Sequence, residues 1–385
     1  MIPGIQFSGI ASGIKAAGLD LGLVCFAQPT NVVSLYTRNK VKAAHILYNR
    51  RRTAKQVRAL LVNSGCANAC TGKEGIEDLA AIAEALASRL GIRKEEILFA
   101  STGVIGRRLP VNTIVSALPA LVTGLNKKNL ELFARAIMTT DTYPKVVKND
   151  IPGENGYRIA GVAKGAGMIN PLFATMLSFL FTDYPLAFDQ LRKLLPTMGR
   201  ESFERITVDG DTSTNDTVMV FARNRDGAEE QHGSFGSFRE KLADAMKSLS
   251  LLIVKDGEGA TKVIHVIVRG AKKKSAAEKI ARSIANSPLV KTAFFGCDPN
   301  WGRIICAAGN AGVPVDPSKA EIVMQGEILV KDGVEVPFSE EKMKKLMDVK
   351  ELELLLDLHG GNASFDIYTT DLTYDYIKIN ASYRT

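Results

Sequence analysis

The segment from Lys164 to Asp183, KGAGMINPLFATMLSFLFTD, constrains the fold more than any other part of the chain, because no residue between its ends is charged. Its length approaches that of a membrane-spanning helix. However, Gly165, Gly167 and Pro171 interrupt its first half, and glycine and proline disfavour a helix interior. The apolar stretch after Pro171 is only about three helical turns long. The segment therefore predicts a buried core element of a soluble protein rather than a membrane span.

With 385 residues, the chain is long enough for two or three domains with substantial cores. Of its residues, 46% are hydrophobic and 23% are charged, which is typical of a globular protein. The N-terminus lacks the layout of a signal peptide and the five cysteines are scattered, so we expect reduced thiols and a cytoplasmic location. The net charge of +8 has no nucleic-acid-binding motif beside it, and we interpret it as favouring solubility and anionic substrates.

Short apolar runs and helical periodicities alternate irregularly along the chain, which predicts an α+β fold. Residues 76–90 place their apolar side chains on one helical face, and Gly91 follows as a stop signal. Residues 97–100 predict a buried strand that leads into Ser101-Thr102-Gly103. Residues 271–385 predict a separate, smaller β-rich domain.

Within this C-terminal domain, Ser275 and Glu278 have the spacing of a capping box at the start of a helix. Lys331-Asp332-Gly333 predicts the turn of a hairpin. We expect strands near residues 363–369 and 374–380.

Several kinds of catalytic site lack their sequence signals in this chain. The four histidines form no metal-ligand pattern, and there is no GxSxG, P-loop or GxGxxG motif. Cys66 and Cys70 lie four residues apart but lack further ligands at zinc-site spacing. We therefore predict no metal and no bound cofactor. A chain so poor in histidine suits a nucleophile that carries its own base.

The pair Ala174–Thr175 offers such a nucleophile. If the chain cut itself between these residues, Thr175 would become a new N-terminus. Its hydroxyl could then attack a carbonyl while its α-amine, with an ordinary pKa near 8, accepts the proton. This interpretation predicts an acyl-transfer enzyme, and the alternative is an uncut core segment without chemistry.

Eight polar, glycine-bearing blocks stand out against apolar surroundings. The blocks are VNSGCANACTG (62–72), STGVIG (101–106), TTDTYPK (139–145), KGAGMI…ATML (164–177), DGDTSTND (209–216), KDGEGATK (255–262), GCDPNWGRI (296–304) and KINASYRT (378–385). Taken together and in this order, they closely resemble the ornithine acetyltransferase family, also called the glutamate N-acetyltransferases of arginine biosynthesis, over essentially the full length.

The resemblance implies a layered sheet-and-helix core of the self-processing acetyltransferase/aminopeptidase type. Cleavage before Thr175 would give an α chain of residues 1–174 and a β chain of 175–385. Residues 175–270 would carry the nucleophile, and 271–385 would form the C-terminal domain. Two or more αβ pairs would assemble.

The resemblance also implies the reaction and its residues. Thr175 would take the acetyl group from N-acetylornithine and pass it to glutamate, and acetyl-CoA is left open as a second donor. The oxyanion would be stabilised by the Thr102 hydroxyl and the Gly103 N–H. The implied substrate-binding residues are Thr139, Lys164, Thr175, Glu258, Asn380 and Thr385.

The chain departs from the family pattern at Leu172-Phe173, where the family usually has Asn-Met, and we expect this change to affect only the rate of self-cleavage. Two alternatives stay open from the sequence. One is an N-terminal-nucleophile aminopeptidase or amidohydrolase, in which water accepts the acyl group. The other is a scaffold with a degenerate site.

Overall fold

The structure is a computed structural model that describes residues 2–51, 56–152, 156–170, 176–224 and 234–382. It divides into two compact units, the first comprising residues 1–204 and 211–253 and the second comprising 205–210 and 254–383. No helix in the described ranges is long and apolar enough to cross a membrane.

The first unit is built on an eight-stranded sheet with the order β4-β3-β2-β8-β7-β6-β5, and β1 pairs with β2. The β3–β4 and β7–β8 pairs are parallel, and the other pairs are antiparallel. The strands are β1 (Ile5–Ile10), β2 (Leu21–Tyr36), β3 (Gln56–Asn63), β4 (Ile97–Ser101), β5 (Lys145–Ile151), β6 (Tyr157–Lys164), β7 (Leu177–Thr182) and β8 (Thr217–Ala222).

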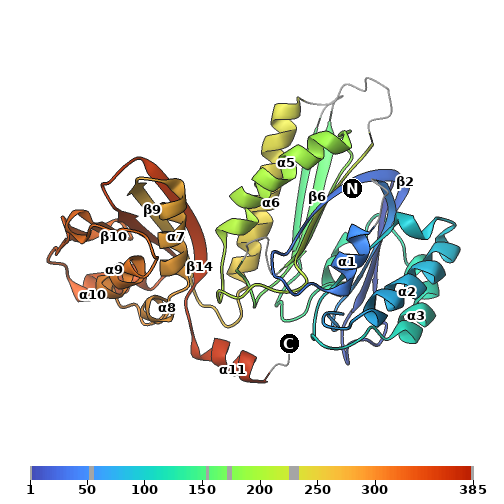
Figure 1. Cartoon of the computed structure of the whole chain (residues 1–385), viewed down its shortest axis with the longest axis horizontal. Coiled ribbons are helices and arrows are strands. Elements are labelled where there is room, and N and C mark those ends of the chain that lie inside the picture. The colour runs from blue at the N-terminus through green and yellow to red at the C-terminus, as the bar shows by residue number, and fades with distance from the viewer. Residues whose placement is uncertain (1, 52–55, 153–155, 171–175, 225–233, 383–385) are drawn as a thin grey trace. The chain divides into compact units, whose positions relative to one another are not determined.

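Helices cover this sheet in layers, with α2 and α3 on one side of the unit's strands and α5 and α6 on the other (Figure 1). Side chains on one face of β2 and β3 pack with α2 and α3, and alternate side chains of the same strands enter a second core shared with β7, β8 and α4. The helices are α1 (Ala44–Arg50), α2 (Glu74–Leu90), α3 (Val111–Thr123), α4 (Leu130–Ala136), α5 (Phe188–Glu201) and α6 (Phe235–Lys255), with short 3-10 helices at Lys94–Glu96 and Phe203–Arg205.

The apolar segment that opened the sequence analysis supplies the central strand β7. Every residue of β7 is buried. Leu177, Phe179 and Phe181 point into the core shared with β2 and α4. A strand covered on both faces needs a nearly continuous apolar sequence, which explains why this run is uncharged. The predicted buried core element is confirmed for the described residues 176–182.

The second unit has a six-stranded sheet with the order β12-β11-β10-β13-β9-β14. Helices α7 and α9 pack on its apolar side chains, and β9 is parallel to β13. Its elements are β9 (Val263–Ala271), α7 (Lys274–Ala285), α8 (Pro288–Phe295), α9 (Trp301–Gly309), a 3-10 helix at Pro317–Lys319, β10 (Glu321–Met324), β11 (Glu327–Lys331), β12 (Val334–Glu335), α10 (Glu340–Met347), β13 (Glu351–Asp357), β14 (Ala363–Thr370) and α11 (Tyr374–Ser382).

The predicted α+β class is confirmed, and so are several local predictions. Helix α2 ends at Gly91, which adopts the left-handed conformation at φ 63°. Strand β4 covers the run predicted at 97–100. The hairpin turn lies at Asp332 and Gly333, both with positive φ, between β11 and β12.

Two predictions about the second unit are wrong. Residues 374–380 form helix α11, not a strand, and Thr373 accepts a hydrogen bond from the Tyr376 N–H at 3.2 Å as a helix cap does. The predicted capping box is absent, because α7 begins at Lys274 and its N-cap is Lys273, so Ser275 lies inside the helix.

Candidate active site

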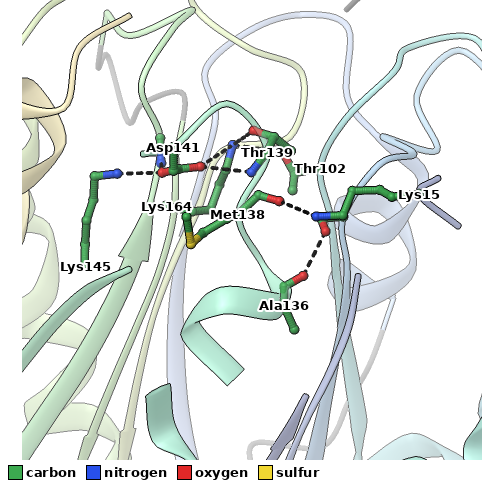
Figure 2. Close-up of polar contacts among 10 residues, drawn as sticks. Lys15, Thr102, Ala136, Met138, Thr139, Asp141, Lys145 and Lys164 are labelled. Carbon is green, nitrogen blue, oxygen red and sulfur yellow. Dashed lines mark hydrogen bonds and ion pairs between the residues drawn. The ribbon is translucent and has the colours of Figure 1, made fainter. Parts of the chain in front are cut away.

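The structure brings three of the predicted site residues together in the first unit. The Lys164 Nζ donates to the Thr139 Oγ1 at 2.7 Å and to the Thr102 Oγ1 at 3.3 Å. Lys164 ends β6, Thr102 follows β4, and Thr139 lies in the segment after α4. Three distant sequence blocks therefore meet in one hydrogen-bonded cluster (Figure 2).

Lys164 also orients the Thr102 hydroxyl. Because the ammonium group donates to the Thr102 oxygen, the hydroxyl proton is free to point toward another acceptor. A hydrogen bond from a charged donor also polarises the hydroxyl that accepts it. The arrangement suits a donor to a developing negative oxygen.

Gly103, next to Thr102, has a conformation that requires glycine. Its φ is +127°, and a Cβ atom here would lie 2.4 Å from the backbone carbon of Gly65. Among the described residues, the Gly103 N–H donates no hydrogen bond of good geometry. The Gly103 N–H and the neighbouring Thr102 hydroxyl are two adjacent donors, the kind of pair that stabilises an oxyanion.

Asp141 is a buried carboxyl group that organises this cluster. It accepts hydrogen bonds from the Gly165 N–H at 2.6 Å and the Thr139 N–H at 3.0 Å. Its carboxylate contacts the Lys145 Nζ at 2.6 Å and the Lys164 Nζ at 3.9 Å, so that it lies between the two lysines (Figure 2). Burial alone would raise the pKa of Asp141, but these two ammonium groups and the Gly165 N–H lower it to about 2.

The sequence analysis missed both Asp141 and Lys145, although both lie in the TTDTYPK block. The signal that could have found them is the charge pair within a block that was singled out for its polarity. Lys145 begins β5 and is fully buried, an unusual place for a lysine without a counter-charge.

Asp216 is a second buried carboxyl group that the sequence analysis did not single out. It is 2% exposed and precedes β8, where the Thr217 N–H donates to the Met176 carbonyl at 2.9 Å. Burial raises the pKa of Asp216 well above its ordinary value, against the opposing effect of the Met176 N–H and the Thr37 hydroxyl. Neither carboxyl oxygen has a described partner in good hydrogen-bond geometry, so we regard those opposing contacts as weak. The charge of Lys164 also acts on this carboxyl group, which places Asp216 near the cluster described above.

We expect Asp216→Asn to stabilise the protein increasingly as the pH rises. A carboxyl group whose pKa is raised in the folded state loses stabilisation as the pH rises from its unfolded value of 3.8 toward the folded value, and asparagine does not titrate. Thermal unfolding should therefore show a higher Tm for the variant at about pH 8 than for the unmodified protein, and a smaller difference at about pH 5. If the Tm of Asp216→Asn were instead lower than that of the unmodified protein by the same amount at both pH values, strong hydrogen bonds to the Asp216 carboxylate would be the cause, and the prediction would be wrong.

In the second unit, the structure brings together two other predicted residues. The Asn380 Nδ2 donates to the Glu258 Oε2 at 2.9 Å and to the Tyr376 carbonyl at 3.1 Å. The Thr373 hydroxyl donates to the Gly259 carbonyl at 2.6 Å, which ties the start of α11 to the turn that carries Glu258. The C-terminal helix α11 is therefore hydrogen-bonded to the turn that carries Glu258.

The remaining predicted residues, Ala174, Thr175 and Thr385, lie outside the described residues, as do Leu172 and Phe173. Their roles and the cleavage site stay predictions. Within the described ranges, no group of three or more histidine, cysteine, aspartate or glutamate side chains could hold a metal ion.

Comparison with known proteins identifies what this chain is similar to. A model described as "ArgJ family" matches residues 6–385. The "Arginine biosynthesis bifunctional protein ArgJ" of Geobacter sulfurreducens is 46% identical over 391 residues, which cover 100% of each chain. The crystal structure of the protein of that name from Bacillus halodurans is 40% identical with a TM-score of 0.50, covering 54% of this chain and 100% of that chain. The ornithine acetyltransferase of Mycobacterium tuberculosis, solved with ornithine, is 36% identical with a TM-score of 0.41, covering 46% of this chain and 93% of that chain.

Proposed function

This chain belongs to the ArgJ family, and from that premise we propose that it transfers the acetyl group of N-acetylornithine to glutamate, giving ornithine and N-acetylglutamate for arginine biosynthesis. The observation that carries this proposal is the cluster of Thr102, Thr139 and Lys164, which come from three blocks of the sequence and share hydrogen bonds beside Gly103.

The reaction takes place in two steps on Thr175. The precursor first cuts itself between Ala174 and Thr175, which frees the α-amine. In the first step, the Thr175 hydroxyl attacks the acetyl carbonyl of N-acetylornithine, its proton passes to the α-amine, and ornithine leaves with a proton. In the second step, the amine of glutamate attacks the acetyl ester and releases the threonine. Covalent catalysis of this kind divides one difficult transfer into two easier ones.

Each step passes through a tetrahedral oxyanion, and the described residues supply its stabilisation. The Gly103 N–H and the Thr102 hydroxyl donate to the oxyanion, and Lys164 fixes the direction of that hydroxyl through its 3.3 Å hydrogen bond. Lys164 and Thr139 also bind the substrate. Glu258, held by Asn380, attracts the cationic side chain of ornithine.

We expect Thr102→Ala to lower kcat by about 100- to 1,000-fold, because it removes one of the donors to the oxyanion. The measurement is steady-state acetyl transfer, together with the Tm to verify folding. Thr102→Ser keeps the hydroxyl and is the matched control, with a small expected effect. Equal rates in the alanine variant and the unmodified protein would refute the oxyanion assignment.

The assay that tests the function supplies N-acetylornithine with and without glutamate. We expect ornithine and N-acetylglutamate to appear in equal amounts when glutamate is present. Free acetate without N-acetylglutamate would favour the N-terminal-nucleophile hydrolase instead. The reaction needs no metal or cofactor, and replacing N-acetylornithine by acetyl-CoA in the same assay determines whether acetyl-CoA is a second donor.

The mature enzyme consists of an α chain of residues 1–174 and a β chain of 175–385, assembled as two or more αβ pairs in the cytoplasm. Two facts support this proposal. The solved chain from Bacillus halodurans aligns over its full length with 54% of this chain. Residues 175–385 make up a similar share, as expected if that solved chain is one of two cleavage products. The five cysteines are free in the structure, which suits a reducing compartment. A denaturing gel tests whether the chain is cut into two, and the mass in solution tests how many αβ pairs assemble.

A further inference from the structure

Lys15 places a second ammonium group at the candidate site. The proposed reaction steps assign no role to this group. Its Nζ donates to the Met138 carbonyl at 3.1 Å, and Lys164 donates to the adjacent Thr139. The two lysines therefore reach the same short segment after α4 (Figure 2).

The backbone around Lys15 is fixed by a buried carboxylate. Asp20 is fully buried and accepts from three backbone N–H groups between residues 12 and 15, at 2.6 to 3.1 Å. A tight turn held by this carboxylate fixes where the lysine stem begins. A flexible surface lysine has no such support.

Close glycine contacts bring the Lys15 side chain next to the oxyanion residue. A Cβ atom on Gly65 would lie 2.6 Å from the Lys15 Cγ, so the stem crosses Gly65 in contact with its backbone. Gly65 in turn lies against Gly103, as the 2.4 Å approach of a Cβ on Gly103 shows. Lys15, Gly65 and Gly103 therefore form one continuous contact, which ends at the donor to the oxyanion.

The charges of this region leave Lys15 able to bind an anion. The Asp141 carboxylate contacts Lys145 and Lys164, and the carboxylate oxygens of Asp20 already accept backbone N–H groups. Burial lowers the pKa of Lys15, and the charge of Lys164 lowers it further. The carboxylates of Asp20 and Asp141 raise it but do not cancel this effect. An ammonium group has three N–H donors, and among the described residues one acceptor is present for those of Lys15. A carboxylate ligand would satisfy the others and offset the excess of positive charge.

The two substrates differ in a way that requires such a group. N-acetylornithine and glutamate share an α-carboxylate, but the side chain of the first ends in an ammonium group and that of the second in a carboxylate. A carboxylate recognises the ammonium group and repels the acceptor's carboxylate, so one charged side chain cannot serve both substrates. The side chain of glutamate therefore requires a cation of its own.

We propose that Lys15 binds the side-chain carboxylate of the acceptor glutamate, and this proposal rests on the proposed function. Lys15 is then a residue that determines specificity in the second step of the reaction. The first step, which uses N-acetylornithine, does not require its charge.

The test compares Lys15→Gln with Lys15→Arg and with Lys148→Gln. Glutamine keeps a donor for the Met138 carbonyl but removes the charge, arginine keeps the charge, and Lys148 is an exposed lysine on β5. Acetylation is followed as the burst of ornithine from N-acetylornithine without glutamate. Deacetylation is followed as kcat/KM for glutamate and, in parallel, for glutamine, the uncharged analogue of the acceptor. The Tm of each variant verifies folding.

For Lys15→Gln, we expect kcat/KM for glutamate to fall by about 10- to 100-fold, the range for a hydrogen bond between charged groups. The burst of ornithine and the reaction with glutamine should change by less than about threefold, and Lys15→Arg should restore much of the activity toward glutamate.

Three outcomes would overturn the proposal: an equal loss with glutamate and glutamine, an equal loss in the burst, or no loss at all. If glutamine is no acceptor even for the unmodified protein, an unchanged KM for glutamate in Lys15→Gln overturns it. An unmodified protein that makes no N-acetylglutamate would instead contradict the proposed function.

Discussion

Replacing Thr175 by alanine should leave the chain of 385 residues uncut and abolish acetyl transfer. In the proposed mechanism, both processes use the same hydroxyl, first against the Ala174 carbonyl and then against the acetyl group. Without self-cleavage there is also no free α-amine to accept the proton. One denaturing gel and one transfer assay measure the two effects on the same preparation.

Thr175→Ser is the matched control, because serine keeps the hydroxyl and should still give two chains and measurable transfer. A Thr175→Ala protein that appears as two chains of the expected masses would contradict the mechanism. An uncut alanine variant that still transfers acetyl groups would separate cleavage from catalysis and would also contradict it.

Replacing Asp141 by asparagine should lower the free energy of unfolding by about 3 to 5 kcal/mol, the usual effect of removing one partner from a buried ion pair. The side chain of Lys145 is fully buried and that of Lys164 is 10% exposed, so neither ammonium group can recover its hydration. Asparagine is close in shape and can still accept from the Gly165 N–H, which limits the change to charge. Denaturant unfolding measures the loss.

The control for this variant is Asp150→Asn, which removes an exposed carboxylate 3.9 Å from the Arg158 Nε. Its effect should stay within about 0.5 kcal/mol, because exposed ion pairs contribute little. A loss at Asp141 no larger than the loss at Asp150 would contradict the electrostatic role given to Asp141.

The Asp141 effect should also depend on pH. The pKa of this carboxyl group is lowered from 3.8 to about 2 in the folded protein. Its stabilising contribution is therefore fully present above about pH 4 and is lost as the pH falls through about 2. The difference between Asp141→Asn and the unmodified protein should shrink over this range, and a constant difference would show that packing, rather than charge, causes the loss.

Local signals in the sequence predicted several elements of the fold correctly. The left-handed Gly91 ends α2, and the apolar run after residue 176 becomes β7, because both depend mainly on the residues present. For α11, the sequence analysis predicted a strand near 374–380, which is wrong. The helix cap at Thr373 was the stronger signal, and Tyr374 and Ile377, three residues apart, are both exposed in the helix.

The candidate site was predictable in part. The blocks that carry the family resemblance singled out Thr102, Thr139 and Lys164, and the structure joins them. Asp141 was missed although its charge pair with Lys145 lies within one block, and Lys15 was missed because its importance depends on contacts across the fold. From the sequence, Lys15 would be predicted to be an ordinary surface lysine. Only the structure shows that its side chain packs against the Gly65 backbone.

The most direct test of the central claim is the mass of the β chain after incubation with N-acetylornithine in the absence of glutamate. We predict that the β chain gains the mass of one acetyl group, that the peptide beginning at Thr175 carries it as an ester, and that added glutamate removes it as N-acetylglutamate. An acetyl group found on another residue, or transfer to glutamate without any acetylated β chain, would contradict the account.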